Sequence, residues 1–110
     1  MGKWVEVATT ADFASTDRMY KEVNDEVQVG IFKLEDGKYY AVEAWCSHQK
    51  VSLVTGDVEG YNIVCPLHGA EFDLRNGRHL CAPAVRPVVS YPVKVDGDAI
   101  LLKVRHAFPD

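Results

Sequence analysis

The 110-residue sequence lacks long apolar runs, a signal peptide and an excess of basic residues. No apolar run approaches the roughly 18 residues of a membrane-spanning helix, and the first residues lack the apolar core of a signal peptide. Basic residues do not predominate, since 12 Lys and Arg against 16 Asp and Glu give a formal net charge of −4. Because phosphate binding needs a basic face, we do not expect nucleic acid as a partner. Since no apolar run is long enough, we expect no membrane association either. The length supports one domain, residues 1–110. We expect it in the cytoplasm, because the sequence shows neither a signal peptide nor a membrane span.

Cysteine is also scarce, and its number excludes two kinds of site. Three cysteines cannot all be paired in disulfides. They are too few for an all-cysteine [2Fe–2S] cluster, which needs four thiolates. The glycine fingerprint of nucleotide-binding proteins is missing as well, so we do not expect the chain to use a nicotinamide dinucleotide itself.

What the sequence does have is a series of short apolar stretches separated by turn signals. No long helix is indicated; a single helical turn capped by Thr10 is expected. Gly30 interrupts one stretch and predicts a bulge, whereas Asp36-Gly37 and Asn76-Gly77 are typical of tight hairpin turns. The clearest pair of strands is expected at 88–95 and 99–104. Together these signals predict an all-β fold, an antiparallel sandwich or barrel.

Two short boxes carry the chemistry of this chain. The first reads Cys46-Ser47-His48, and the second, after residues 49–64, reads Cys65-Pro66-Leu67-His68. Each box follows a predicted strand and lies on a predicted turn, where rigid scaffolds tend to present functional residues. Two thiolates and two imidazoles form a complete ligand set for a metal centre. The candidate cofactor and metal ligands are therefore Cys46, His48, Cys65 and His68.

Three interpretations of these boxes remain open at this point. Zinc accepts two sulfurs and two nitrogens, although its usual spacing groups like ligands together, whereas each box here is mixed. A [2Fe–2S] cluster with two cysteines on one iron and two histidines on the other fits both the number and the pairing. Alternatively, the residues are ordinary buried cysteines and loop histidines. Cys81, near His79, is a further candidate ligand, but a packed thiol is the simpler expectation.

The order C-S-H, sixteen residues, C-P-L-H-G resembles the signature of Rieske [2Fe–2S] proteins. The flanking segments 68–84 and 90–98 are similar to the small Rieske ferredoxins of bacterial multicomponent aromatic-ring-hydroxylating dioxygenase systems. This resemblance implies a Rieske-type cluster with Cys46 and Cys65 on one iron and His48 and His68 on the other. It also implies that residues of about 45–83 form a cluster-binding subdomain inserted into a β scaffold built from both ends of the chain.

The same resemblance implies a one-electron carrier rather than an enzyme. Its partners would be a flavin-containing ferredoxin reductase and a terminal aromatic-ring dioxygenase. Two other functions are kept as alternatives: a Rieske-like small subunit of a nitrite reductase, and a zinc-stapled interaction domain. Docking is expected at the loop tips, around Gln49, Lys50, Leu67, Pro83 and Ala84.

The sequence also lacks side chains that raise the reduction potential in other Rieske proteins. High-potential Rieske proteins carry an extra disulfide between their ligand loops, at positions occupied here by Val51 and Leu67. They also carry a serine and a tyrosine that donate hydrogen bonds to sulfur, at positions occupied here by Ala70 and Phe72. Fewer donors stabilise the reduced state less. We expect a potential at the low end of the range known for Rieske centres, on the order of −150 mV.

Overall fold

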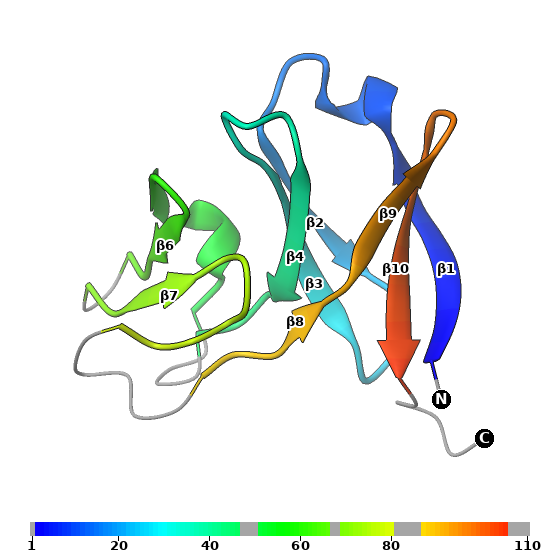
Figure 1. Ribbon diagram of the computed structural model, residues 1–110. Helices are drawn as coiled ribbons and strands as arrows, with labels where there is room; N and C mark the ends of the chain where they lie inside the picture. Colours follow the sequence, from blue (N-terminus) through cyan, green and yellow to red (C-terminus); the bar gives the residue numbers. More distant parts are fainter. Residues whose placement is uncertain (1, 47–50, 67–68, 81–86, 106–110) are drawn as a thin grey trace.

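The computed structural model describes residues 2–46, 51–66, 69–80 and 87–105. Within these residues the chain forms three antiparallel sheets and two short 3₁₀ helices (Figure 1). The predicted all-β fold is therefore confirmed. Among the described residues, no helix has the length and apolar character needed to cross a membrane.

The first sheet joins the two ends of the chain. Its strands lie in the order β1-β10-β9, and β1 and β10 pair from Gly2↔Arg105 to Thr9↔Ala99. The register shifts once, between Glu6 and Ala8. The bounds are β1 Gly2–Thr9, β9 Val93–Asp96 and β10 Ala99–Arg105.

The second sheet is the middle layer of the molecule. Its order is β2-β3-β4-β8, with bounds β2 Arg18–Glu22, β3 Gln28–Lys33, β4 Tyr39–Glu43 and β8 Ser90–Tyr91. The helix η1 (Thr10–Phe13) connects it to the first sheet. Alternate residues of β3 point to opposite faces, as in any strand: Val29 and Ile31 join one core, and Phe32 joins the other. Both faces of this strand are therefore buried, which explains its nearly continuous apolar sequence.

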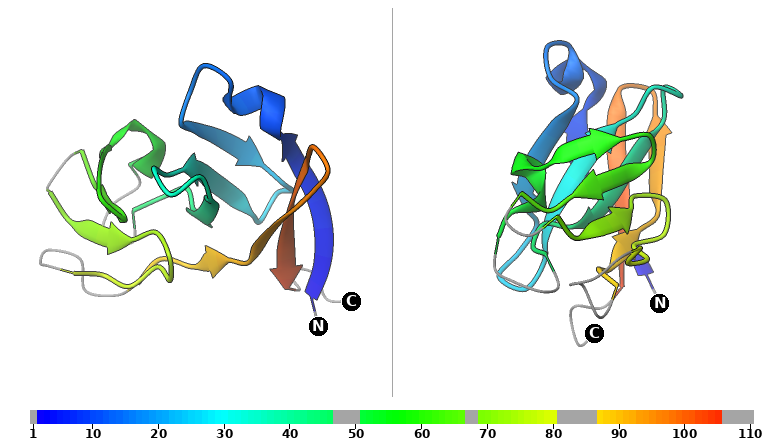
Figure 2. Two further views of the ribbon diagram at one scale, coloured as in Figure 1. Left: turned by 45° about the horizontal axis from the view of Figure 1, so that its top comes forward. Right: turned by 90° about the vertical axis from the view of Figure 1, so that its left-hand side faces the viewer.

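The third sheet is inserted in the chain between β4 and β8. It has the order β5-β6-β7, with bounds β5 Asp57–Glu59, β6 Asn62–Val64 and β7 Glu71–Asp73, and it follows the helix η2 (Leu53–Thr55). Figures 1 and 2 place it on the side of the scaffold opposite β1 and β10. Its buried side chains pack against the middle layer in one core, which contains Phe32, Leu34, Val42, Cys46, Leu53, Ile63, Cys65, Ala70, Phe72, Leu74 and Val88.

Three details differ from the sequence predictions. Gly30 makes no bulge: it pairs with Tyr20 in unbroken register, and a Cβ there would lie 3.0 Å from the Phe32 ring and 3.1 Å from Val54. A glycine fits here because Val54 of η2 packs closely onto the sheet at this point and leaves little room for a side chain. The stretch 88–95 is two strands rather than one, because the chain changes sheets at Pro92, a residue without an amide donor. The cap of η1 is Thr9 rather than Thr10, and its amide donates to the Asp12 carboxylate at 2.9 Å.

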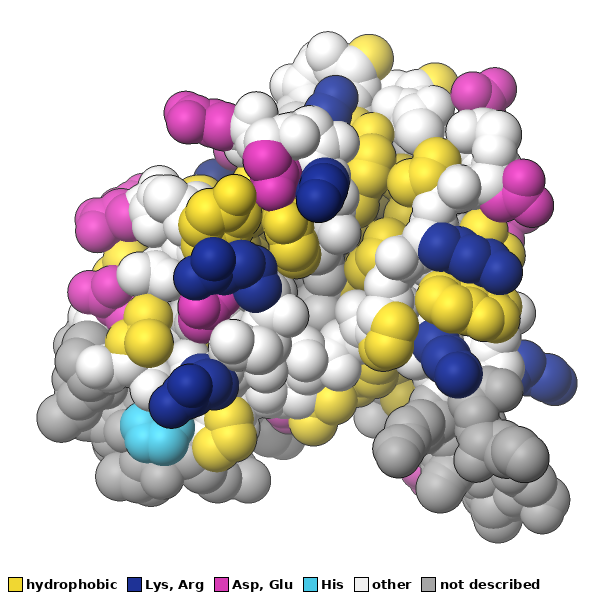
Figure 3. All heavy atoms as spheres, viewed as in Figure 1, with side chains coloured by type: hydrophobic (Ala, Val, Ile, Leu, Met, Phe, Trp, Pro, Cys, Tyr) yellow, Lys and Arg dark blue, Asp and Glu magenta, His cyan; other side chains and the backbone are white. Residues whose placement is uncertain are grey.

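Acidic and basic side chains are interspersed on the face drawn in Figure 3. Among the described side chains of this face, no continuous basic surface is formed.

Candidate metal centre

The first cysteine lies at the base of a hairpin that follows β4. The Leu53 amide donates to the Ala44 carbonyl at 2.7 Å, Trp45 pairs with Ser52, and the Cys46 amide donates to the Val51 carbonyl at 3.0 Å. From one pair to the next, one partner moves forward by one residue and the other moves back by one. The two segments therefore run antiparallel in constant register. The residues between Cys46 and Val51 include His48.

The second cysteine has the same position in the hairpin formed by β6 and β7. Here Ile63 pairs with Phe72 and Val64 with Glu71, and the Cys65 amide donates to the Ala70 carbonyl at 2.7 Å. Both cysteine amides thus bond the carbonyl five residues further along the chain. The residues that follow Cys65 include His68. Each cysteine therefore lies where a strand-like segment meets the turn of its hairpin, while His48 and His68 lie outside the described residues.

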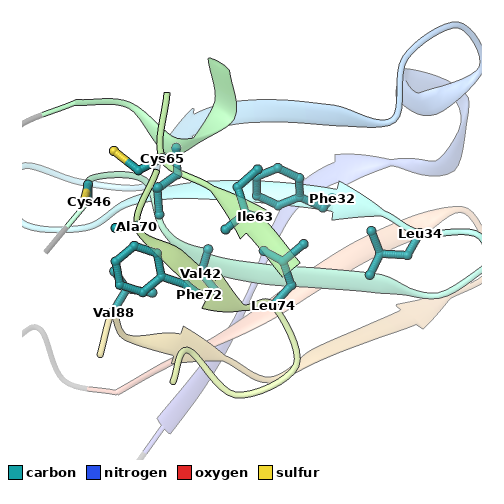
Figure 4. Close-up of a cluster of buried hydrophobic side chains, with 11 residues drawn as sticks. Phe32, Leu34, Val42, Cys46, Ile63, Cys65, Ala70, Phe72, Leu74 and Val88 are labelled. Carbon is teal, nitrogen blue, oxygen red and sulfur yellow. The ribbon is translucent and has the colours of Figure 1, made fainter. Parts of the chain in front are cut away.

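The two cysteines meet in the core between the inserted sheet and the middle layer. Cys46 is 5% exposed and Cys65 is 2% exposed, and both belong to the same cluster of buried side chains. Figure 4 shows their sulfur atoms at the same end of this cluster. Cys65 forms no disulfide. The fold thus brings together two thiols that are separated by nineteen positions in the sequence.

The donor set at this end of the core suits iron. Burying a thiolate among apolar side chains costs free energy, and a bound cation offsets that cost. Soft sulfur ligands are those that iron–sulfur clusters use. The described residues alone contain no group of three or more ligating side chains. His48, His68 and Cys81 lie outside the described residues, so the placement of the imidazoles and the role of Cys81 stay predictions.

Gly69 closes the second turn with a backbone conformation that suits glycine. Its φ is +76°, in the left-handed region, and its amide donates to the Cys65 carbonyl at 3.0 Å. This hydrogen bond closes the turn immediately before Ala70, whose carbonyl receives the Cys65 amide.

The turn after β7 is held by a buried carboxylate. Asp73, 7% exposed, accepts hydrogen bonds from the Arg75 amide at 2.9 Å and from the Arg75 guanidinium at 3.0 and 2.9 Å. These bonds to Arg75 hold the pKa of Asp73 below its usual value. Arg75 also stacks on the Tyr61 ring at 4.2 Å. The hairpin that carries Cys65 is thus braced at the end opposite its cysteine.

A model of the Rieske [2Fe–2S] domain matches residues 3–92 of this chain. The chain belongs to the Rieske family. The ferredoxin component of the naphthalene 1,2-dioxygenase/salicylate 5-hydroxylase systems of Ralstonia sp is 32% identical over 101 residues, covering 92% of this chain and 95% of that protein. The 3-phenylpropionate/cinnamic acid dioxygenase ferredoxin subunit of Escherichia coli (strain K12) is 40% identical over 74 residues, covering 66% and 70%.

A solved structure supports the same assignment. The Rieske protein superimposes on the ferredoxin of carbazole 1,9a-dioxygenase from Nocardioides aromaticivorans IC177 with a TM-score of 0.81 and 34% identity, covering 91% of this chain and 96% of that one. The cofactor of the Rieske protein is accordingly a [2Fe–2S] cluster of Rieske type, and its function is electron transfer rather than catalysis. The zinc interpretation is therefore wrong, whereas the assignment of individual ligands stays a prediction.

The sequence located the two cysteine loops but missed the residues that support them. Neither η2 nor β5 was expected, and Arg18 carried no recognisable signal. The D-x-R-N-G order at 73–77 could have indicated the braced turn, because a short acidic side chain commonly accepts hydrogen bonds from backbone amides two residues on.

Proposed function

We propose that this Rieske protein carries single electrons, in the cytoplasm, from a flavin-containing reductase to a terminal aromatic-ring dioxygenase. The observation that carries the proposal is the pair of equivalent hairpins, since each contributes one cysteine to the same buried core. The relatives named as ferredoxin components of dioxygenase systems support the choice of partners.

Cys46 and Cys65 would hold one iron, and His48 and His68 the other. The bound cluster supplies a site that accepts and releases one electron. Because imidazoles are neutral ligands, replacing two thiolates by two imidazoles removes negative charge and raises the reduction potential. The two cysteines are nearly inaccessible to solvent. Transfer to a partner would therefore use the histidine side, with residues of about 45–83 acting as the cluster-binding unit.

The ligand assignment is tested on the purified protein by metal analysis and by EPR of the reduced form. We expect about two irons per chain and a rhombic signal with a low average g value, the mark of nitrogen ligation. His48→Ala and His68→Ala should lose this signal. His79→Ala, which changes an exposed histidine, is the matched control and should keep it. Iron-free protein, or an unchanged signal in both ligand variants, would contradict the assignment.

The choice of partners is tested by transfer kinetics. The docking residues proposed from sequence, Gln49, Lys50, Leu67, Pro83 and Ala84, lie outside the described residues. Leu67→Glu should slow reduction of the oxygenase and leave the cluster spectrum unchanged. Val95→Glu, on the scaffold strand β9 and 45% exposed, is the control and should transfer at the wild-type rate. Equal rates for all three proteins would reject docking at the loop tips.

A further inference from the structure

Arg18 connects the β scaffold to the cluster-bearing part of the chain. It is the first residue of β2, and its Nη1 atom donates to the carbonyl of Val54 at 3.2 Å and also to the carbonyl of Gly56. Its Nε atom donates to the Asp17 carboxylate at 2.9 Å. One guanidinium group therefore binds two backbone carbonyls that are 36 and 38 positions away in the sequence.

These carbonyls belong to the segment that directly follows the first ligand hairpin. Val54 lies in η2 (Leu53–Thr55), and Gly56 is its C-cap. The last carbonyls of a helix have no partner within the helix, so they need a donor from elsewhere. Arg18 supplies that donor with a positive charge, which is also favourable at the C-terminal end of a helix.

Gly56 in turn touches the strand that leads to the second cysteine. A Cβ atom at Gly56 would lie 2.0 Å from the carbonyl oxygen of Val64, so the two backbones are in direct contact. Val64 is the last residue of β6 and precedes Cys65. At this contact the chain leaving the first hairpin begins to run antiparallel to the strand that leads to the second, with Asp57 paired to Val64.

The Arg18 guanidinium is also held in place by a contact with an aromatic ring. The Arg18 guanidinium lies 5.7 Å from the centroid of the Phe32 ring. Phe32 is fully buried and packs in the same core as both cysteines. Because the guanidinium is hydrogen-bonded at its edges and packed on a ring, little freedom remains for it to move.

We propose that Arg18 is a positioning residue that fixes the placement of the two cysteine-bearing hairpins relative to each other, and thereby sets the ligand geometry of the cluster. The proposal rests on the ligand roles of Cys46 and Cys65 and is independent of the electron-transfer partners. Because the Arg18 guanidinium forms an ion pair with Asp17, its removal leaves that carboxylate uncompensated, and the added negative charge disfavours the reduced state of the bound cluster.

The side chain has to be arginine for geometric reasons. A guanidinium has five donors in a planar fork and bonds two carbonyls and a carboxylate at once. A lysine ammonium carries the same charge but no such fork. Lysine at this position keeps the charge and loses the geometry, while methionine loses both, so the two substitutions separate the two contributions.

The experiment compares Arg18→Lys, Arg18→Met and the control Lys21→Met, which removes an exposed charge from the same strand. The measurements are EPR g values, midpoint potential and hydrogen exchange at the amides of Gly56 and Cys65 in the cluster-loaded protein. We expect Arg18→Met to shift the g values, lower the midpoint potential and speed exchange by about ten-fold, as expected for the loss of hydrogen bonds to a charged donor. Arg18→Lys should retain most of the potential but show the altered g values and the faster exchange.

The expected result for Lys21→Met is wild-type behaviour in all three measurements. Wild-type g values and exchange in Arg18→Met would overturn the proposal, even if thermal stability fell, because a merely structural role predicts only that fall. An equal shift of potential in Lys21→Met would assign the effect to net charge and would also overturn it. Should Arg18→Met fail to fold, Arg18→Lys with unchanged g values and exchange would decide against the proposal. The EPR signal of the wild type reports separately whether the ligand assignment is correct.

Discussion

At the scale of single residues, one carboxylate joins the scaffold to the inserted sheet. Asp36, at the β3–β4 turn, accepts hydrogen bonds on Oδ2 from the hydroxyl of Tyr40 at 2.7 Å and from that of Tyr61 at 3.3 Å. The two rings meet edge to face, 6.1 Å apart. Tyr40 belongs to β4 and Tyr61 precedes β6, so the contact crosses between sheets.

The Tyr40 hydroxyl should lose its proton only at very high pH. Its hydrogen bond to Asp36 raises its pKa from 10.0 to about 12. Because the folded-state pKa is raised, the stabilisation is present below pH 10 and is lost as the pH rises through about 12. Ultraviolet difference titration should show one tyrosine ionising near 12, and Tyr40→Phe should remove that step. The step would remain if another tyrosine were responsible.

A substitution at Phe72 tests the argument that the absence of a hydroxyl at this position lowers the reduction potential of the cluster. It is fully buried in the core that holds both cysteines. Phe72→Tyr should raise the midpoint potential by about 40 mV, if the new hydroxyl bonds reduced-state sulfur more strongly by about 1 kcal/mol. Redox titration measures the shift, and Phe72→Leu controls for altered packing. A wild-type midpoint well above zero would show that the low-potential expectation is wrong.

At the scale of the elements, the β7 turn depends on one glycine for two reasons. Gly77 has a φ of +81°, and a Cβ atom there would lie 2.1 Å from the Val88 carbonyl oxygen. The Val88 amide donates to the Gly77 carbonyl at 2.9 Å. The turn after β7 therefore packs directly against the segment that leads into β8 of the middle sheet.

Gly37 provides a matched control for a substitution at Gly77. It has the same φ of +81°, but a Cβ atom there would meet nothing within 4 Å. Gly37→Ala should therefore cost only the backbone strain, about 1–2 kcal/mol of unfolding free energy. Gly77→Ala should cost about 1–3 kcal/mol more because of the collision with the backbone. Urea denaturation of both variants measures the difference; equal losses would show that the Val88 contact is unimportant.

The elements also show how far the sequence could predict this protein. Asp36-Gly37 and Asn76-Gly77 correctly predicted turns, because the residues that specify a turn lie within the turn itself. The bulge predicted at Gly30 was wrong and the close contact at Gly56 was missed, since both glycines face residues in distant segments, Val54 and Val64. Arg18 was missed for the same reason, because its acceptors lie more than thirty positions away. The sheet change at Pro92 likewise depends on pairing between β4 and β8.

At the scale of the whole molecule, the inserted sheet and the scaffold share one core. Phe32, Leu34 and Val42 of the scaffold pack with Ile63 and Phe72 of the inserted sheet. Removal of the cluster should therefore weaken the entire molecule rather than the insertion alone. We expect visible absorbance and far-ultraviolet circular dichroism to change in one coincident thermal transition. Bleaching well before the loss of strand signal would show that the insertion unfolds independently.

The pairing of Gly2 with Arg105 has a practical consequence. Both described ends of the chain meet on the side of the scaffold away from the inserted sheet (Figure 1). A linker attached at either end would leave the cysteine-bearing hairpins unobstructed. The protein is therefore suited to tethering on an electrode, or to covalent fusion with a redox enzyme, with the cysteine-bearing hairpins facing away from the point of attachment.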